Sequence, residues 1–338
     1  MEDLFKKYLK EKDVSKYEKS YAWKTAIGLQ KVDGLSPSDY LIKLANDNIN
    51  NELDFEEAHR LINNYYVEKN ECSERTQEAD KVSVRIAEIL SEKSFTFSIV
   101  EYISIHKRLF EGIYESAGKL RKYNISKEEW VLDGDTVSYG NVFSLEENLK
   151  YDFNAQKEIN LRNLSKDELV KIMAKFISNL WQNHIFCEGN TRTTAVFLIK
   201  YLRNLGLNVT NDIFEKNAWY FRNALVRANY NNYNLQVFET TEYLEMFLKN
   251  LMFGENNLLS NRELHIKYKK EEISYSKISN KEKIINILKE EPKITLYDAS
   301  IKINKSLRTV KNIVKKLEEE EIVIREGSKK TGSWKVLR

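Results

Sequence analysis

The densest group of reactive side chains in the chain lies between Asn183 and Thr194, where a histidine, a glutamate, a Gly-Asn pair and an arginine follow one another. His184 titrates near neutral pH and can take a proton from a hydroxyl group. Glu188 is an oxygen ligand of the kind that Mg²⁺ prefers. Arg192 offers a planar, fork-shaped donor for phosphate oxygens. A base, a metal ligand and a phosphate-binding cation that lie so close together indicate phosphoryl-transfer chemistry.

Two apolar segments at helical spacing, residues 172–181 and 195–205, flank this group. The group is therefore predicted as a loop that leads into a helix N-terminus. Unpaired backbone N–H groups and the positive end of the helix dipole favour an anion at such a position. Gly189 lets the backbone approach a ligand closely, and Asn190 tolerates the unusual dihedral angles of an anion nest. With Thr191, these residues are predicted to hold phosphate.

Length and composition restrict the class of protein. The chain has 338 residues, of which 42% are hydrophobic, which favours about two domains of ~100–200 residues. The formal net charge of +3 is too small for a protein that coats a polyanion, so any nucleic-acid contact should be confined to one segment. Cys72 and Cys187 provide neither a disulfide framework nor a zinc ligand set. The charged N-terminus and the lack of ~18 consecutive apolar residues predict a cytoplasmic protein without a membrane span.

Few helix breakers occur, since the chain has 2 prolines and 11 glycines, and long helices are therefore expected. Helices are predicted over residues 20–32 and 38–50, with a third around 55–62. Together they suggest a small helical module over residues 1–70. The helical pattern then dominates residues 75–253, which are predicted to form the catalytic domain.

One interruption of this pattern lies at residues 130–139, where Asp133-Gly134 separates two β-prone runs. Asp-Gly between such runs is a strong hairpin signal. A lone hairpin is too small to be a core sheet, so it is interpreted as a lid over a site, with a plain surface hairpin as the alternative.

The composition changes after residue 253. Residues 254–279 are polar and rich in Lys and Glu, as in a linker, and residues 280–338 show the helix, helix, helix and hairpin order of a winged helix-turn-helix. DNA contacts are predicted for its recognition helix and wing, namely for Lys305, Ser306, Arg308, Thr309, Lys311, Asn312, Lys329 and Lys330. An acidic run over residues 318–321 leaves a purely protein-binding role open.

The spacing His184-x-Phe186-x-Glu188-Gly189-Asn190-x-Arg192 resembles the signature of Fic-domain proteins, and the resemblance covers roughly residues 75–250. It implies a mainly α fold, with a Fic-like helical bundle and a β-hairpin flap. It also implies transfer of AMP from Mg-ATP to a Ser, Thr or Tyr hydroxyl of a target protein or of the chain itself, releasing pyrophosphate. By this resemblance His184 is the base and Glu188 holds Mg²⁺. The phosphates are held by Gly189, Asn190, Thr191 and Arg192. The flap edge, which aligns the target by backbone pairing, is formed by Thr136, Val137, Ser138 and Tyr139.

The chain departs from this signature at Ala195, where the family has a second arginine that holds the γ-phosphate or pairs with an inhibitory glutamate. The nucleotide donor therefore stays open. Removal of AMP and use of another phosphate-containing donor are alternative functions, as is a DNA-binding transcriptional regulator with a weak Fic core.

The N-terminal module also resembles the antitoxin-like helix that restrains many Fic proteins, in a degenerate form. Leu29 stands in place of the hydroxyl residue, and Asp33-Gly34 stands in place of Glu-Gly. In the family the acidic residue pairs with the second arginine, and Ala195 occupies that position here. The sequence therefore predicts that the usual salt bridge does not form and that the helix inhibits weakly or only sterically. The expected partners are a hydroxyl-bearing protein, ATP and DNA, with a second copy of the chain left open.

Overall fold

The computed structural model describes residues 14–68, 73–209, 212–268, 280–303, 305–320, 322–327 and 332–337. The chain divides into two compact units, Met1–Tyr268 and Lys269–Arg338, and each unit is described by itself.

The first unit begins with four helical segments, α1 (Val14–Leu29), a 3-10 turn (Gln30–Asp33), α2 (Asp39–Ile49) and α3 (Phe55–Glu68). Ser38 caps α2, because its Oγ accepts a hydrogen bond of 3.1 Å from the Leu41 N–H. Helix α2 thus begins close to the start of the helix that the sequence predicted over residues 38–50.

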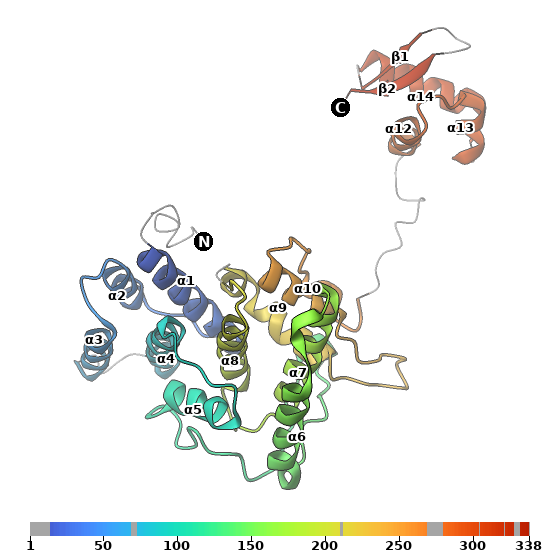
Figure 1. The fold of residues 1–338 in the computed structure, drawn as a ribbon. Helices are drawn as coiled ribbons and strands as arrows, with labels where there is room; N and C mark the ends of the chain where they lie inside the picture. Colours follow the sequence, from blue (N-terminus) through green and yellow to red (C-terminus); the bar gives the residue numbers. More distant parts are fainter. Residues whose placement is uncertain are drawn as a thin grey trace. The chain divides into compact units, whose positions relative to one another are not determined.

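The rest of this unit is also helical, as Figure 1 shows. It contains α4 (Glu74–Ser91), α5 (Ile99–Phe110), α6 (Leu145–Glu158), α7 (Lys166–Asn183), α8 (Asn190–Asn204), α9 (Ile213–Arg227), α10 (Glu242–Phe253) and the short α11 (Asn261–Leu264). Shorter 3-10 turns lie at Trp130–Leu132, Val142–Ser144 and Leu161–Asn163. Helix α8 is buried at every residue from 190 to 202. It is therefore the central helix, and its N-terminus is held by packing on all sides.

The N-terminal helices α1 to α3 pack into the same core as helices α4 to α10. Trp23 and Leu29 of α1 are fully buried, and α1 packs against both α4 and α9. A Cβ atom at Gly28 would lie 2.5 Å from the Cα of Glu215 in α9, so the glycine is needed for this close approach. The boundary that the sequence placed at about residue 70 therefore lies inside one compact unit.

The predicted hairpin at residues 130–139 is wrong in its secondary structure. Residues 130–132 form a 3-10 turn, and no strand is assigned between residues 123 and 141, all of which are described. Val131 and Leu132 are both buried although they are adjacent, which a strand with one buried face does not allow. The Val131 carbonyl accepts a hydrogen bond from the Ile266 N–H (2.9 Å) instead of pairing with a neighbouring strand.

Part of the predicted linker over residues 254–279 belongs to the first unit. Leu264 is fully buried, and its carbonyl accepts a hydrogen bond of 2.7 Å from the Arg227 guanidinium. Residues 269–279 lie outside the described residues.

The second unit has the predicted winged helix-turn-helix order, α12 (Asn280–Glu290), α13 (Leu296–Lys302), α14 (Leu307–Glu319), β1 (Val323–Glu326) and β2 (Ser333–Val336). The two strands are antiparallel, with Val323 opposite Val336. Ile284, Leu288 and Val310 are fully buried in a separate core. In the described part of the chain, no helix combines the length and hydropathy that crossing a bilayer requires.

Candidate active site

His184 lies at the C-terminal cap of α7 in a left-handed conformation, with φ of 45°. Its ring packs against Tyr139 and Trp181, with centroids 4.4 and 5.3 Å away. Burial, and to a lesser extent the positive charges of Lys127 and Arg222, hold the pKa of His184 well below its usual value. Its Nδ1 is buried and has no hydrogen-bond partner among the described residues. The imidazole is therefore neutral at pH 7 and able to accept a proton.

Arg121 fixes the backbone around His184 and was not assigned a role from the sequence. Its Nε donates a hydrogen bond of 2.7 Å to the His184 carbonyl, and its other nitrogens donate to the carbonyls of Tyr123 and Gly140. The Arg121 N–H also donates to the Ile185 carbonyl at 2.8 Å. One side chain thus joins the end of the segment 136–140 to the loop that begins at His184.

The loop before α8 is closed by its own side chains. The Asn190 amide accepts a hydrogen bond from the Phe186 N–H (3.0 Å) and donates one to the Phe186 carbonyl (2.8 Å). The Thr191 hydroxyl accepts from the Trp181 indole at 3.0 Å. At Gly189, with φ of 77°, a Cβ would lie 2.3 Å from the Phe110 ring. The side chains of Asn190 and Thr191 are therefore engaged within the protein, and their contribution to phosphate binding is left to backbone N–H groups.

Glu188 stands at the edge of this loop with 58% of its side chain exposed, 2.9 Å from the Lys127 ammonium. Its carbonyl bonds to His106 Nε2 (3.0 Å), and the Gly118 N–H donates to His106 Nδ1 (2.9 Å). Nδ1 must therefore be the unprotonated nitrogen. No group of three or more metal-ligating side chains occurs in the described residues. A single carboxylate suits Mg²⁺ that is carried by phosphates, which is the usual arrangement for this ion.

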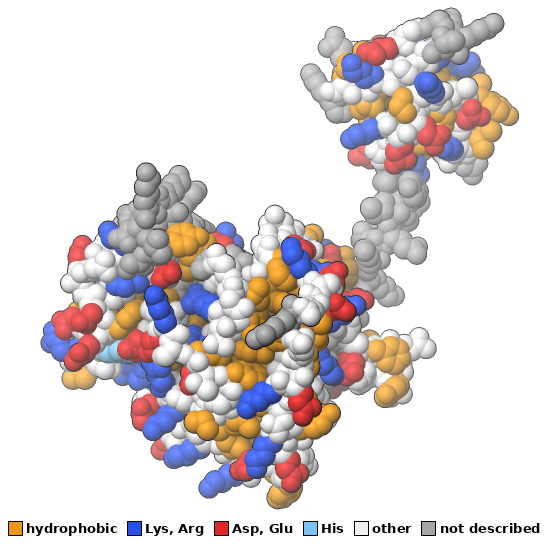
Figure 2. Space-filling view, viewed as in Figure 1, with side chains coloured by type: hydrophobic (Ala, Val, Ile, Leu, Met, Phe, Trp, Pro, Cys, Tyr) orange, Lys and Arg blue, Asp and Glu red, His pale blue; other side chains and the backbone are white. Residues whose placement is uncertain are grey.

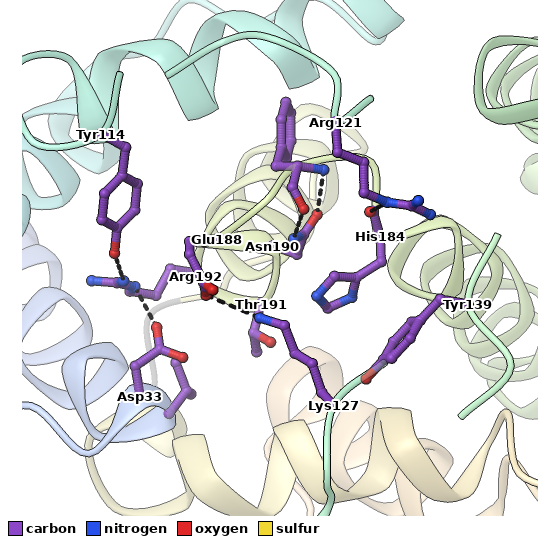
Figure 3. Close-up of polar contacts among 12 residues, drawn as sticks. Asp33, Tyr114, Arg121, Lys127, Tyr139, His184, Glu188, Asn190, Thr191 and Arg192 are labelled. Atoms are coloured by element: carbon purple, nitrogen blue, oxygen red, sulfur yellow. Dashed lines mark hydrogen bonds and ion pairs between the residues drawn. The ribbon is translucent and has the colours of Figure 1, made fainter. Parts of the chain in front are cut away.

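Arg192 is the most enclosed charged group of the site, with 1% of its side chain exposed. Its Nε lies 2.8 Å from Asp33 Oδ2, and its terminal nitrogens bond to Glu78 (2.6 Å), Gln30 (3.1 Å) and Tyr114 (3.2 Å). Figure 3 shows Asp33 and Tyr114 in contact with Arg192, with Glu188 nearby.

The usual salt bridge to the second arginine of the motif is absent, but Asp33 still pairs with an arginine. Ala195 is fully buried, and Asp33 pairs instead with the first arginine of the motif. Asp33 Oδ1 also lies 3.6 Å from Arg222. Gly34 follows in the left-handed conformation (φ of 66°) that ends the 3-10 turn, and Leu29 is buried in the core. Of the three residues assigned to the inhibitory motif, only Asp33 contacts the site with its side chain.

A cavity of about 720 Å³ lies beside these groups. Its walls include Asp33, Glu78, Glu188, Arg192 and Arg222. Sequence reasoning missed Glu78 and Arg222, because neither belongs to a motif and the chain separates both from Arg192 by tens of positions. Only the packing of α4 and α9 brings them to the cavity.

Of the four residues assigned to the flap edge, Tyr139 is the one whose side chain contacts His184. Val137 is buried, whereas Ser138 is exposed and its carbonyl accepts a hydrogen bond of 3.1 Å from the Gln182 side chain. The Thr136 hydroxyl accepts from the Lys127 N–H at 3.2 Å. Tyr139 packs against His184 and donates a hydrogen bond of 3.0 Å to Glu129. The end of the segment is thus fixed beside His184 without belonging to a sheet.

The run over residues 229–233, for which the sequence left an adenine-binding role open, does not line the cavity. Asn229 is buried against Ser178, and the Tyr230 hydroxyl donates to Asp135. This run therefore connects α9 to the turn before the flap edge.

In the second unit, the predicted DNA-contacting residues lie on or before α14. The Ser306 hydroxyl caps this helix and bonds to the Thr309 hydroxyl at 2.8 Å. The side chains of Lys305, Arg308, Lys311 and Asn312 are exposed. Lys329 and Lys330 lie outside the described residues.

Comparison with known proteins gives matches for both units. Residues 96–202 match the Fic/DOC family, and residues 279–324 match a winged helix-turn-helix DNA-binding family. A probable protein adenylyltransferase of Sinorhizobium fredii, y4lH, is 28% identical over 145 residues, which are 43% of this chain and 70% of that protein. The protein adenylyltransferase VbhT of Bartonella schoenbuchensis is 27% identical over 139 residues, which are 41% of this chain but 27% of that protein.

Two solved structures are similar at lower identity. The N-terminal FIC domain of the Bep8 protein from Bartonella sp. 1-1C has a TM-score of 0.42 and 20% identity, over 54% of this chain and 88% of that one. A Fic family protein from Desulfovibrio desulfuricans G20 has a TM-score of 0.46 and 14% identity, over 99% of this chain and 93% of that one. From the family matches together with the geometry of the loop before α8, the chain carries a Fic/DOC family domain followed by a C-terminal winged helix-turn-helix domain.

Proposed function

We propose that the protein transfers AMP from ATP to a Ser, Thr or Tyr hydroxyl of a protein. The hydroxyl oxygen forms a bond to the α-phosphorus, the bond from that phosphorus to the bridging oxygen breaks, and pyrophosphate leaves. The relatives named protein adenylyltransferases support this reaction. The observation that carries it is a neutral, buried His184 beside the segment 136–139, one short loop away from the N-terminus of α8.

His184 is the group that takes the proton of the attacking hydroxyl. A general base must be unprotonated before it can take a proton, and burial, which lowers the pKa of His184, favours this neutral form. Tyr139 and Trp181 hold the ring by packing, and Arg121 holds the backbone that carries it. The residues around the base therefore fix its position, which is a main source of rate in phosphoryl transfer.

The phosphates of the donor bind at the N-terminus of α8, where the backbone N–H groups of the first turn and the helix dipole favour negative charge. Arg192 adds a cation when its present partners release it. Glu188 holds Mg²⁺, which when bound neutralises phosphate charge during the transfer. Lys127 occupies the Glu188 carboxylate in this structure and must move aside first.

Labelling with ATP that carries the label at either the α- or the γ-phosphate tests the reaction, with His184→Ala as the inactive control. Proteins labelled from the α-phosphate alone, and not by the variant, are expected. Labelling from the γ-phosphate alone would mean a kinase reaction. Labelling from neither position would contradict the use of ATP and favour another phosphate-containing donor, which the burial of Ala195 in place of a second arginine allows.

Asp33 inhibits this reaction by occupying Arg192. A carboxylate 2.8 Å from Nε competes directly with a phosphate oxygen for the same guanidinium. The 3-10 turn over residues 30–33 also lines the cavity, so it limits the space for the donor. Inhibition is therefore both electrostatic and steric, and stronger than the sequence alone suggests.

The second unit binds DNA through α14. Its match to a DNA-binding family and the exposed cations Arg308 and Lys311 on one helix support this role. Such binding is expected to be sensitive to salt, because phosphate contacts release counterions. Electrophoretic mobility shifts with DNA from upstream of the gene test it, and salt-independent binding or none would contradict it.

A further inference from the structure

The loop between α9 and α10, residues 230–238, projects from the body of the first unit, as Figure 1 shows. Its large apolar side chains are exposed, with 79% of Tyr233, 58% of Leu235 and 53% of Phe238 accessible to solvent. Figure 2 shows hydrophobic side chains gathered on this projection. A cluster of exposed apolar groups on a soluble unit marks a surface that another molecule covers.

The loop is held in one conformation by its own hydrogen bonds. Asn232 and Val237 exchange two backbone hydrogen bonds of 2.8 and 3.0 Å, and the Leu235 N–H donates to the Asn232 side chain at 3.1 Å. The rings of Tyr233 and Phe238 contact edge to face with centroids 5.9 Å apart. A preformed apolar surface loses little conformational entropy when it binds, which is typical of a recognition element.

The base of the loop is tied to the turn that precedes the flap edge. The Tyr230 hydroxyl donates a hydrogen bond of 2.6 Å to Asp135 Oδ2, and the Asn232 amide donates to the Tyr230 oxygen at 3.0 Å. Asp135 is followed directly by Thr136, the first residue of the flap edge. The base of the loop is thereby attached to the residue that directly precedes the flap edge.

We propose that the 230–238 loop is the docking surface for the protein whose hydroxyl receives AMP. This inference rests on the proposed function. The occupant is a folded protein with an apolar patch near the acceptor hydroxyl. The loop presents three apolar side chains, and its base is hydrogen-bonded to Asp135, which directly precedes the segment that aligns the acceptor. A short acceptor peptide would reach the flap edge but not the loop.

The test compares the full chain with the variant Tyr233→Ser/Leu235→Ser/Phe238→Ser. A control variant, Val67→Ser/Val100→Ser/Leu258→Ser, replaces three side chains of equal or greater exposure (78%, 78% and 79%) elsewhere in the unit. A protein that the full chain labels from the α-phosphate of ATP in a lysate is purified and used as substrate. Initial rates are measured over a range of substrate concentrations. ATP affinity, melting temperature and molar mass are measured alongside.

We expect the loop variant to lose at least tenfold in kcat/KM, mainly through KM, with ATP affinity and melting temperature unchanged. The control variant should match the full chain in every measurement. An unchanged kcat/KM in the loop variant would overturn the docking proposal and leave the transferase intact. A molar mass that falls by half only in the loop variant would show that a second copy covers the loop, which would also overturn it. If the unmodified chain labels no protein, both the proposed function and this inference are contradicted.

Discussion

The guanidinium Nε of Arg192 lies 2.8 Å from the carboxylate of Asp33, and the same side chain bonds to Glu78 at 2.6 Å. Two segments far apart in the sequence, the 3-10 turn after α1 and the helix α4, thus hold one cation. Loss of one carboxylate is unfavourable, because it leaves the buried guanidinium with less compensation of its charge. Phosphate must replace at least one of these carboxylates before Arg192 can contribute to donor binding.

Asp33→Asn should increase the initial rate of AMP transfer about tenfold, which corresponds to about 1.4 kcal/mol. The substitution keeps the shape of the side chain but removes the charge that competes with phosphate. The rate at low ATP concentration is the measurement, and Glu52→Gln, an exposed acidic residue of the same N-terminal region, is the control. A slower or equal rate for Asp33→Asn would mean that Asp33 does not restrain the site.

The pH dependence of kcat/KM should lack the usual histidine limb at pH 6.5. Burial lowers the pKa of His184, so its neutral form persists below this pH and the rate should stay constant between about pH 6.5 and 7.5. A profile with half-maximal rate at pH 6.5 or above would show that the base is solvated, in contradiction to the structure.

The free energy of unfolding should fall as the pH decreases from about 6.5 towards 4. Burial lowers the pKa of His106 to about 4, so the unfolded chain binds a proton in this range that the folded chain does not. Stability is therefore present above the unfolded pKa and is lost as the pH falls. Denaturant unfolding at several pH values measures the slope, and His106→Asn, which removes the titrating group, should reduce it.

Lys127→Met should lower the Mg²⁺ concentration that gives half-maximal activity by about two- to fivefold, the range expected for a partly exposed ion pair. The ammonium lies 2.9 Å from Glu188 and competes with the metal for the carboxylate. Titration of activity with Mg²⁺ checks this, with the exposed Lys119→Met as the matched control. An increased Mg²⁺ requirement would instead give Lys127 a direct role in binding the donor.

Arg308→Ala and Lys311→Ala should each weaken DNA binding and reduce the slope of log affinity against log salt by about 1. Both side chains are exposed on α14 and carry the charge that phosphates require. Fluorescence anisotropy at several salt concentrations provides the slope, and Lys289→Ala on α12 is the control. If all three variants bind equally, α14 does not face the DNA.

The sequence predicted the order of helices and the reactive loop because their signals are local. Ser38 and Ser306 cap helices where the sequence places N-cap residues, and apolar spacing marks the helices around His184. The hairpin prediction failed for a non-local reason. The Val131 carbonyl bonds to Ile266, and burial of both Val131 and Leu132 favours a tight turn over a strand.

The partners of Arg192 could likewise not be predicted from local sequence patterns. Ala195 correctly indicated that the usual salt bridge is absent. No local pattern, however, indicated that Arg192 would pair with Asp33 in place of the second arginine. Glu78 was missed because it lies on α4 in a segment without a motif. Such pairs follow from how three helices pack, and one sequence does not specify this packing.

The enclosure of Gln30, Asp33 and Arg192 in one network has a thermodynamic consequence for the whole first unit. If the donor binds Arg192 more tightly once the turn over residues 30–33 has moved away, then donor binding must loosen that turn by the same factor. Any molecule that binds the N-terminal helices in their displaced form would likewise raise the affinity for the donor. The position of the N-terminal helices and the occupancy of the donor site are then coupled reciprocally. Hydrogen exchange in residues 30–33 would therefore report the occupancy of the donor site.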